Sequence, residues 1–185
     1  MRPALATLAL VLAVTRAAAQ EASLSGDPIT ADRLLATQEM IRVADAIDAA
    51  VDAKDWAEAR SHFTDTITVD FTSLAGGEPA TIPAQGLIDG WSTNLSAEKP
   101  SFHLRGNHRV TFLDEDSAVM RSHGYAWNRL ERGAEPANGG DPMWEVWGEY
   151  VHGFTLTDAG WKVDAMSLAV SAQRGNDFVR DTPGS

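Results

Sequence analysis

The sequence lacks several of the motifs that define common protein classes. It contains no cysteine, which excludes disulfides and a lipid anchor on a cysteine after the N-terminal apolar run. It also has no G-x-S-x-G motif, no phosphate-binding loop and no dinucleotide-binding fingerprint. The chain therefore carries none of the best-known sequence signatures of serine hydrolases, nucleotide hydrolases and dinucleotide-dependent enzymes.

Positive charge is scarce in this chain. Fifteen Lys and Arg residues stand against 26 Asp and Glu residues, and the formal net charge is −11. An acidic surface repels nucleic acid and anionic membranes, so we expect neither as a partner. The charge says little about a small ligand in a buried cavity.

The first segment is typical of a secretory signal peptide. A short basic start, Met1-Arg2, precedes an apolar run over Ala4–Val14 and the small residues Ala17–Ala19. The run is too short to span a membrane comfortably, although an uncleaved anchor is the alternative. We expect residues 1–19 to be removed and the mature protein to be periplasmic or secreted, with no membrane contact afterwards.

The remaining chain is long enough for one domain with a single core. Residues 20–29 are small and polar and are expected to form a flexible leader. Residues 30–172 carry the periodic apolar patterns of a folded domain, and residues 173–185 are expected to be a polar tail.

The order of elements is typical of an α+β protein. Apolar residues at helical spacing predict a long helix over 33–53, and further helices are expected at 55–62 and 83–95. Alternating patterns predict strands at 66–71, 102–113, 117–130, 143–156 and 161–170, with loops at 76–79 and 133–142.

Gly106 lies inside the strand expected over 102–113, where a glycine indicates a bulge. His103 and Arg105 precede it on one alternation, and Val110 and Phe112 follow it on the other. One extra residue at Gly106 would place all four side chains on the same face of the sheet.

Asp52 and His103 are the leading candidates for chemistry. Asp52 follows Val51, the last member of the apolar stripe of the first helix. A carboxylate that orients an imidazole can remove a proton from carbon or from water, because imidazole ordinarily titrates near neutral pH. The residues alone leave open an ordinary acid near a helix end, aided by Lys54 or Arg60, and a structural histidine on a sheet.

Four segments in this order resemble scytalone dehydratase and the SnoaL-like proteins of the nuclear transport factor 2-like superfamily. They are KDWAEARSHFTDTITVDF (54–71), FHLRGN (102–107), SAVMRSHGYAW (117–127) and DAGWKV (158–163). The resemblance covers roughly residues 30–170. It implies a cone-shaped barrel, in which a strongly curved antiparallel sheet wraps over a long N-terminal helix and leaves a cavity.

The resemblance also implies roles for individual residues. The aspartate and histidine at the positions of Asp52 and His103 form a catalytic dyad without a cofactor. His123 matches a second pocket histidine, with a core histidine bonded to a backbone carbonyl as the alternative. Tyr150 falls where scytalone dehydratase has a pocket asparagine, as a donor to substrate or as an aromatic wall. Apart from the resemblance, aromatic residues at strand spacing indicate a ligand cavity or, alternatively, core or oligomer interface. The remaining residues expected to contact substrate are Val51, Phe71, Tyr125 and Trp127.

At two pocket positions the sequence differs from scytalone dehydratase, and these differences argue against the same reaction in this protein. The two pocket tyrosines of that enzyme correspond here to Val51 and Phe71, and neither side chain can donate a hydrogen bond. His123, Tyr125 or Tyr150 would have to replace these donors. His103, His108, His123 and His152 match no known metal spacing, so we expect no metal site, with zinc as the alternative.

These patterns predict a cofactor-independent lyase, resembling a dehydratase, or an isomerase, acting on a small apolar molecule such as a cyclic or phenolic compound. A binding or assembly module without catalysis is the main alternative, because the fold does not fix function. A hydrolase that activates water on an epoxide or ester is a third possibility. Bulky residues on the outer face of the sheet, and the behaviour of the relatives, predict a dimer or trimer.

Overall fold

A computed structural model describes residues 26–183 except 29, 32 and 131–138. The predicted signal peptide, and most of the predicted leader and of the loop at 133–142, lie outside the described residues. Among the described residues, no helix combines the length and the apolarity that a membrane crossing requires.

The long N-terminal helix is present as α2, Leu34–Ala53. Its buried residues include Met40, Ala44 and Ile47, which recur at helical spacing and face the sheet. Lys54 ends the helix in a left-handed conformation, with φ of 61°. The turn leads directly into α3, Trp56–Ser61, whose first turn is capped by the Asp55 carboxylate through the amide of Glu58 at 3.0 Å. Asp52 therefore lies in the last turn of α2.

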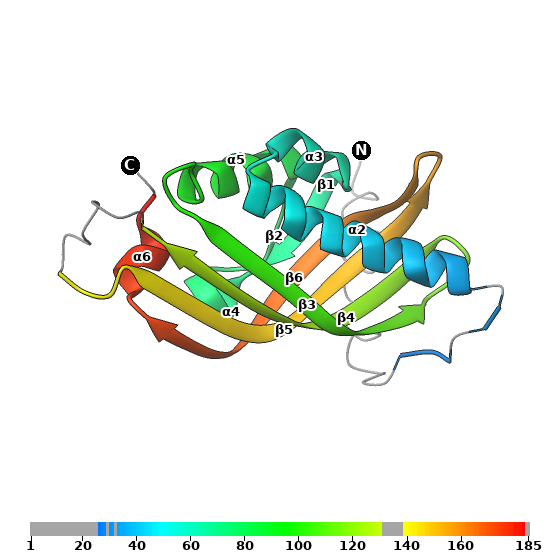
Figure 1. The fold of residues 1–185 in the computed structure, drawn as a ribbon. Helices are drawn as coiled ribbons and strands as arrows, with labels where there is room; N and C mark the ends of the chain where they lie inside the picture. Colours follow the sequence, from blue (N-terminus) through cyan, green and yellow to red (C-terminus); the bar gives the residue numbers. More distant parts are fainter. Residues whose placement is uncertain (1–25, 29, 32, 131–138, 184–185) are drawn as a thin grey trace, which may run out of the picture.

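Six strands form one strongly curved sheet with the order β2-β1-β6-β5-β4-β3. The strands are β1 (Phe63–Asp70), β2 (Ala80–Pro83), β3 (Ser101–Phe112), β4 (Ser117–Arg129), β5 (Met143–Thr157) and β6 (Gly160–Gly175). All neighbouring pairs are antiparallel except β1 and β6. Helix α2 crosses the concave face of the sheet, and α5 (Ala84–Asn94) lies beside α3 at one end of it (Figure 1). The predicted α+β cone is confirmed.

The predicted bulge in β3 is present. Gly106 pairs with His123 and Arg109 pairs with Arg121, so one residue more lies on β3 than on β4 between these pairs. Asn107 adopts a positive φ of 56° in this segment. As a result, His103 and Arg105 before the bulge, and Val110 after it, all face the helix side of the sheet.

Two short elements between β1 and α5 were not predicted. Helix α4 (Thr72–Ala75) and strand β2 fall in and around the expected loop at 76–79. Their sequences are too short for a periodic signal, and β2 is fixed by its antiparallel pairing with β1 rather than by its own residues.

The expected leader and tail both contain ordered, packed residues. The amide of Asp27 donates to the carbonyl of Val110 at 2.8 Å, and the Asp27 carboxylate accepts from the amide of Phe112 at 3.0 Å. At the other end, β6 continues to Gly175 and is followed by α6, Asp177–Asp181. The polar composition of residues 173–185 suggested a tail, but one side chain of α6, Val179, is fully buried.

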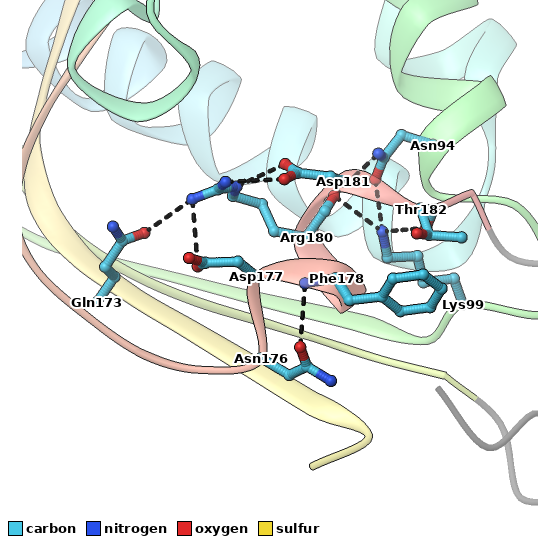
Figure 2. A network of polar contacts seen from close by, with 9 residues as sticks. All are labelled: Asn94, Lys99, Gln173, Asn176, Asp177, Phe178, Arg180, Asp181 and Thr182. Carbon is cyan, nitrogen blue, oxygen red and sulfur yellow. Dashed lines mark hydrogen bonds and ion pairs between the residues drawn. The ribbon is translucent and has the colours of Figure 1, made fainter. Parts of the chain in front are cut away.

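A buried lysine holds α6 in place. The ammonium of Lys99 donates to Asn94 Oδ1 at 2.7 Å, to the Thr182 carbonyl at 2.9 Å and to the Arg180 carbonyl at 3.2 Å (Figure 2). These three acceptors match the three donors of an ammonium group. Burial lowers the pKa of Lys99 to about 8. The C-terminal helix is thus attached to the loop that follows α5, at one end of the cone.

Candidate functional site

A cavity of about 390 Å³ lies between α2, the concave face of the sheet and the helices α5 and α6. This volume is in the range of sites for small molecules. Most of the lining is apolar, with a few polar side chains among it. The lining residues used below are Asp48, Val51, Phe71, His103, Arg105, Asn128, Trp144 and Tyr150.

Asp52 and His103 are hydrogen bonded to each other beside this cavity. Asp52 Oδ1 lies 2.7 Å from His103 Nδ1, and Asp52 Oδ2 accepts the backbone N–H of His103 at 2.7 Å. The carboxylate accepts the proton on Nδ1, so Nε2 is the ring nitrogen left to act as a base. The predicted contact between the two residues is therefore present, across 51 positions of sequence, while their catalytic role stays a prediction.

Two further side chains extend the polar chain from Asp52. The hydroxyl of Ser101 donates to Asp52 Oδ1 at 2.8 Å, and the ammonium of Lys54 donates to that hydroxyl at 2.8 Å. Burial raises the pKa of Asp52. The hydrogen bonds from His103 and Ser101, together with the charge of His103, outweigh it and hold the pKa below its ordinary value. Asp52 is therefore a carboxylate at neutral pH.

A second ion pair involves an acid one turn earlier on α2 and was not predicted. The Arg105 guanidinium donates to Asp48 through Nε at 2.5 Å and Nη2 at 2.6 Å, and both side chains line the cavity. Burial lowers the pKa of Arg105, but the charge of Asp48 outweighs it and raises the pKa. The third nitrogen of Arg105, Nη1, is buried and has no partner among the described residues. In the sequence, Arg105 stands out only as a neighbour of His103 on the same face of the strand before the bulge.

Tyr150 lines the cavity, as predicted, and its ring is held by Arg105. The guanidinium carbon of Arg105 lies 3.8 Å from the ring centroid. The ring also covers Gly124, where an added Cβ would come within 2.5 Å of two ring carbons, so a side chain at position 124 would displace it. Burial raises the pKa of Tyr150, although the charge of Arg105 opposes this, and the phenol keeps its proton at neutral pH.

Val51 and Phe71 also line the cavity, as predicted. Their side chains supply apolar surface at the positions where the resemblance to scytalone dehydratase would have placed hydroxyl donors. The donors facing this cavity must therefore come from elsewhere, and Tyr150 and Arg105 are two donor side chains that line it.

The expectation that His123, Tyr125 and Trp127 line the cavity is wrong. On β4 the inward positions are Ala126 and Asn128, so the odd-numbered residues face outward. His123 is exposed and contacts the Asn107 side chain at 3.0 Å. The hydroxyl of Tyr125 donates to Glu145 at 2.7 Å, and Trp127 stacks on Phe102 with ring centroids 6.2 Å apart. His123, Tyr125 and Trp127 do share one face of β4, as the alternating pattern indicated, but that face is the outer face of the sheet.

No candidate metal centre is found in the part of the chain that the structure describes. No group of three or more His, Asp or Glu side chains there could hold an ion. Of the four histidines considered for zinc, His103 bonds Asp52, His108 lies 3.6 Å from Asp45, and His123 is on the outer face. His152 is fully buried in the core, and burial holds its pKa well below the ordinary value.

Comparison with known proteins shows the family of the chain. The description "SnoaL-like domain" belongs to a family profile that matches residues 32–167. No curated protein sequence matches the chain. Among solved structures, the Kfla4162 protein from Kribbella flavida is 28% identical, with a TM-score of 0.71 over 77% of this chain and 95% of that one.

Two further solved structures share the fold at lower identity. A candidate scytalone dehydratase from Novosphingobium aromaticivorans is 19% identical, with a TM-score of 0.65 over 80% of this chain and 92% of that one. The hexachlorocyclohexane dehydrochlorinase LinA-type3 from Novosphingobium barchaimii is 14% identical, with a TM-score of 0.64 over 78% and 92%. The resemblance seen in the sequence is confirmed, and the chain belongs to the SnoaL-like domain family, with a nuclear transport factor 2-like fold.

Proposed function

We propose that this protein is a cofactor-independent lyase or isomerase that acts on a small, largely apolar molecule. His103 removes a proton from an acidic C–H bond through Nε2, and Asp52 stabilises the imidazolium that forms. The observation that carries this proposal is the hydrogen bond from His103 Nδ1 to Asp52 at the wall of an apolar cavity. Solved structures with this fold include proteins described as a dehydratase and a dehydrochlorinase.

The negative charge that develops on the substrate also needs a partner. Tyr150 is a protonated phenol facing the cavity, and the Arg105 cation lies against its ring. A donor of this kind can stabilise an enolate or assist the departure of a hydroxide or halide. Tyr150 therefore takes the role left open by Val51 and Phe71, and the outward direction of His123 removes it from this role.

The test can precede identification of the natural substrate. β-Tetralone is a bicyclic ketone with acidic C–H protons, and its exchange with D₂O can be followed by NMR. We expect the wild-type protein to accelerate this exchange, and we expect His103→Gln to lose roughly 10²–10⁴-fold of the acceleration. His123→Gln is the matched control, because it makes the same change on the opposite face of the sheet.

The competing function is ligand binding without chemistry. The apolar residues Val51 and Phe71, in place of donors, are the observation that favours it. β-Tetralone that binds the wild-type protein but exchanges no faster than in buffer would support this alternative. Exchange that is equally fast in wild type and His103→Gln would exclude His103 as the base.

We further propose that the mature protein is exported and self-associates as a dimer or trimer. The outer face of the sheet carries Phe102 and Leu104 as exposed apolar side chains, next to the contact between Tyr125 and Trp147. Light scattering that gives only the monomer mass at micromolar concentration would contradict self-association. An intact mass that still includes Met1 in a Gram-negative host would contradict export.

A further inference from the structure

Besides Arg105, two side chains on the cavity wall have polar atoms that nothing in the described structure satisfies. Asn128 on β4 and Trp144 on β5 are direct neighbours in the register, and both line the cavity. Asn128 is 8% exposed and Trp144 is 3% exposed. Among the described residues, neither Asn128 Oδ1 nor Trp144 Nε1 has a hydrogen-bond partner.

Unsatisfied buried groups of this kind are rare in folded proteins, because they have given up water without gaining a partner. Two such groups side by side, one an acceptor and one a donor, are harder to explain by packing alone. An apolar residue of similar size at either position would avoid the cost. Their presence on a cavity wall indicates that a ligand supplies the missing partner.

The chemistry of the two atoms favours a ligand group that both accepts and donates. The indole N–H of Trp144 can only donate, and Asn128 Oδ1 accepts. A hydroxyl group satisfies both at once, since its oxygen accepts from the indole and its proton is donated to the amide oxygen. A ketone or an ether can only accept, and would leave Asn128 Oδ1 without a donor.

The register places this pair beside the proposed base. Ser101 is paired with Asn128, and His103 is paired with Ala126, two positions earlier on the same face of β4. Two residues along a strand span roughly 7 Å, about the length of one ring with its substituent. Ala126 and Val146 lie in the same row of the register as His103 and give an apolar floor beside it.

The structure has one more feature at this end of the cavity. Helix α6 covers it, with Val179 packed in one cluster with Ala126, Leu130, Trp144 and Val146. Arg180 and Asp181 line the same cavity. The network around Lys99 holds this helix against the loop after α5 (Figure 2). A hydroxyl bound here would lie under α6 and away from bulk water.

We propose that Asn128 and Trp144 form a hydroxyl-binding subsite, and that the ligand of this protein is a hydroxylated cyclic molecule with an apolar body. The hydroxyl binds between the two side chains, and the apolar body extends over Ala126 and Val146 toward His103. This inference deepens the proposed function by naming the substrate class, and it depends on that function only for the identity of the reacting carbon.

Binding of three matched probes tests the subsite. The probes are β-tetralone, 6-hydroxy-β-tetralone and 6-methoxy-β-tetralone, titrated by calorimetry. We expect the wild-type protein to bind the hydroxyl compound about tenfold more tightly than the methoxy compound, because the methoxy oxygen can accept from Trp144 but cannot donate to Asn128, and one hydrogen bond of ordinary net strength gives about this factor. Asn128→Leu should remove most of this preference, and Trp144→Phe should weaken the binding of both compounds, while Trp147→Phe, on the outer face of β5, should change neither.

A second measurement needs no ligand. Asn128→Leu removes an unsatisfied buried group, so the melting temperature of the free protein should stay the same or rise. A lower melting temperature would mean that Asn128 has a structural partner, and would overturn the subsite. Equal affinity of the wild type for the hydroxyl and methoxy compounds, or no binding of either, would also overturn it.

The result separates the two proposals. His103→Gln should keep the hydroxyl preference, because His103 takes no part in binding that group. If His103→Gln keeps the preference for the hydroxyl compound and the wild type does not accelerate exchange at carbon, the result would support the subsite and exclude His103 as the base. Exchange by the wild type with no preference for the hydroxyl compound would do the reverse.

Discussion

Two carboxylates one turn apart on α2 make similar contacts with opposite consequences. Asp48 holds Arg105 and Asp52 holds His103, and the two partners are two residues apart on the same face of β3. The Asp48–Arg105 side chains are 10% and 4% exposed, and the Asp52–His103 side chains are 21% and 17% exposed. The more buried pair has a partner that never loses its proton.

The difference shows how one geometry can serve two purposes. Arginine keeps its charge at every pH of interest, so the Asp48 pair fixes a cation under Tyr150 and cannot exchange a proton. Histidine can gain and lose a proton, so the Asp52 pair can take part in chemistry. The choice of partner on β3, not the position of the acid on α2, separates a structural ion pair from a candidate base.

The largest effect is expected from breaking the Asp52 pair. Asp52→Asn and His103→Gln should each lower the rate of carbon–hydrogen exchange by roughly 10²–10⁴-fold. The double variant should be little slower than either single one, because residues that act as one unit are not additive. Multiplicative losses in the double variant, measured with β-tetralone in D₂O, would show that the two residues act independently.

Breaking the Asp48 pair should mainly affect stability. Asp48→Asn leaves the buried Arg105 cation without its counter-charge, and we expect the free energy of unfolding to fall by about 3–5 kcal/mol. Urea unfolding followed by tryptophan fluorescence measures this loss. The control is the double variant Asp48→Leu with Arg105→Met, which removes both charges and should recover most of the stability; an equally unstable double variant would argue against the charge explanation.

The pH dependence of stability sharpens the comparison. The pKa of Asp52 is lower in the folded protein than its ordinary value of 3.8. The carboxylate therefore stabilises the fold above about pH 4, and this contribution is lost as the pH falls through the folded pKa. The difference in unfolding free energy between wild type and Asp52→Asn should shrink as the pH falls from about 5 toward 3. A difference that does not change with pH would mean that the carboxylate charge is not what stabilises the fold.

The smallest effect is expected on the outer face of β4. His123→Gln should change the unfolding free energy by less than about 0.5 kcal/mol and should leave the exchange rate unchanged, because His123 is exposed. A thermal melt and the exchange assay together check this. A marked loss of exchange would mean that His123 reaches the substrate, contrary to its position on β4.

The strong periodic signals predicted most of the fold. The apolar stripe predicted α2, and the long alternating runs predicted β3, β4 and β5 within two residues at each end. Gly106 located the bulge, and through it the side of the sheet that His103 and Arg105 face. The short elements α4, β2 and α6 were missed because their positions depend on contacts with β1, β4, β5 and β6, which no local pattern records.

The site was predicted in part for the same reason. Asp52 and His103 were identified by motifs, and Val51, Phe71 and Tyr150 followed from the resemblance. The placement of His123, Tyr125 and Trp127 failed because alternation gives two faces and does not say which one is inward. Arg105, Asn128 and Trp144 were not proposed as site residues because their importance rests on pairs and on unsatisfied atoms, which become visible only in three dimensions.

The two carboxylate oxygens of Asp52 both bind His103, one at its side chain and one at its backbone. The main chain and the imidazole are therefore fixed to a single carboxylate, and the rotational freedom of the side chain is lost during folding and not during the reaction. The imidazole therefore has the same orientation before and after a ligand binds. Its ring should give a single, sharp set of NMR resonances with or without a bound molecule.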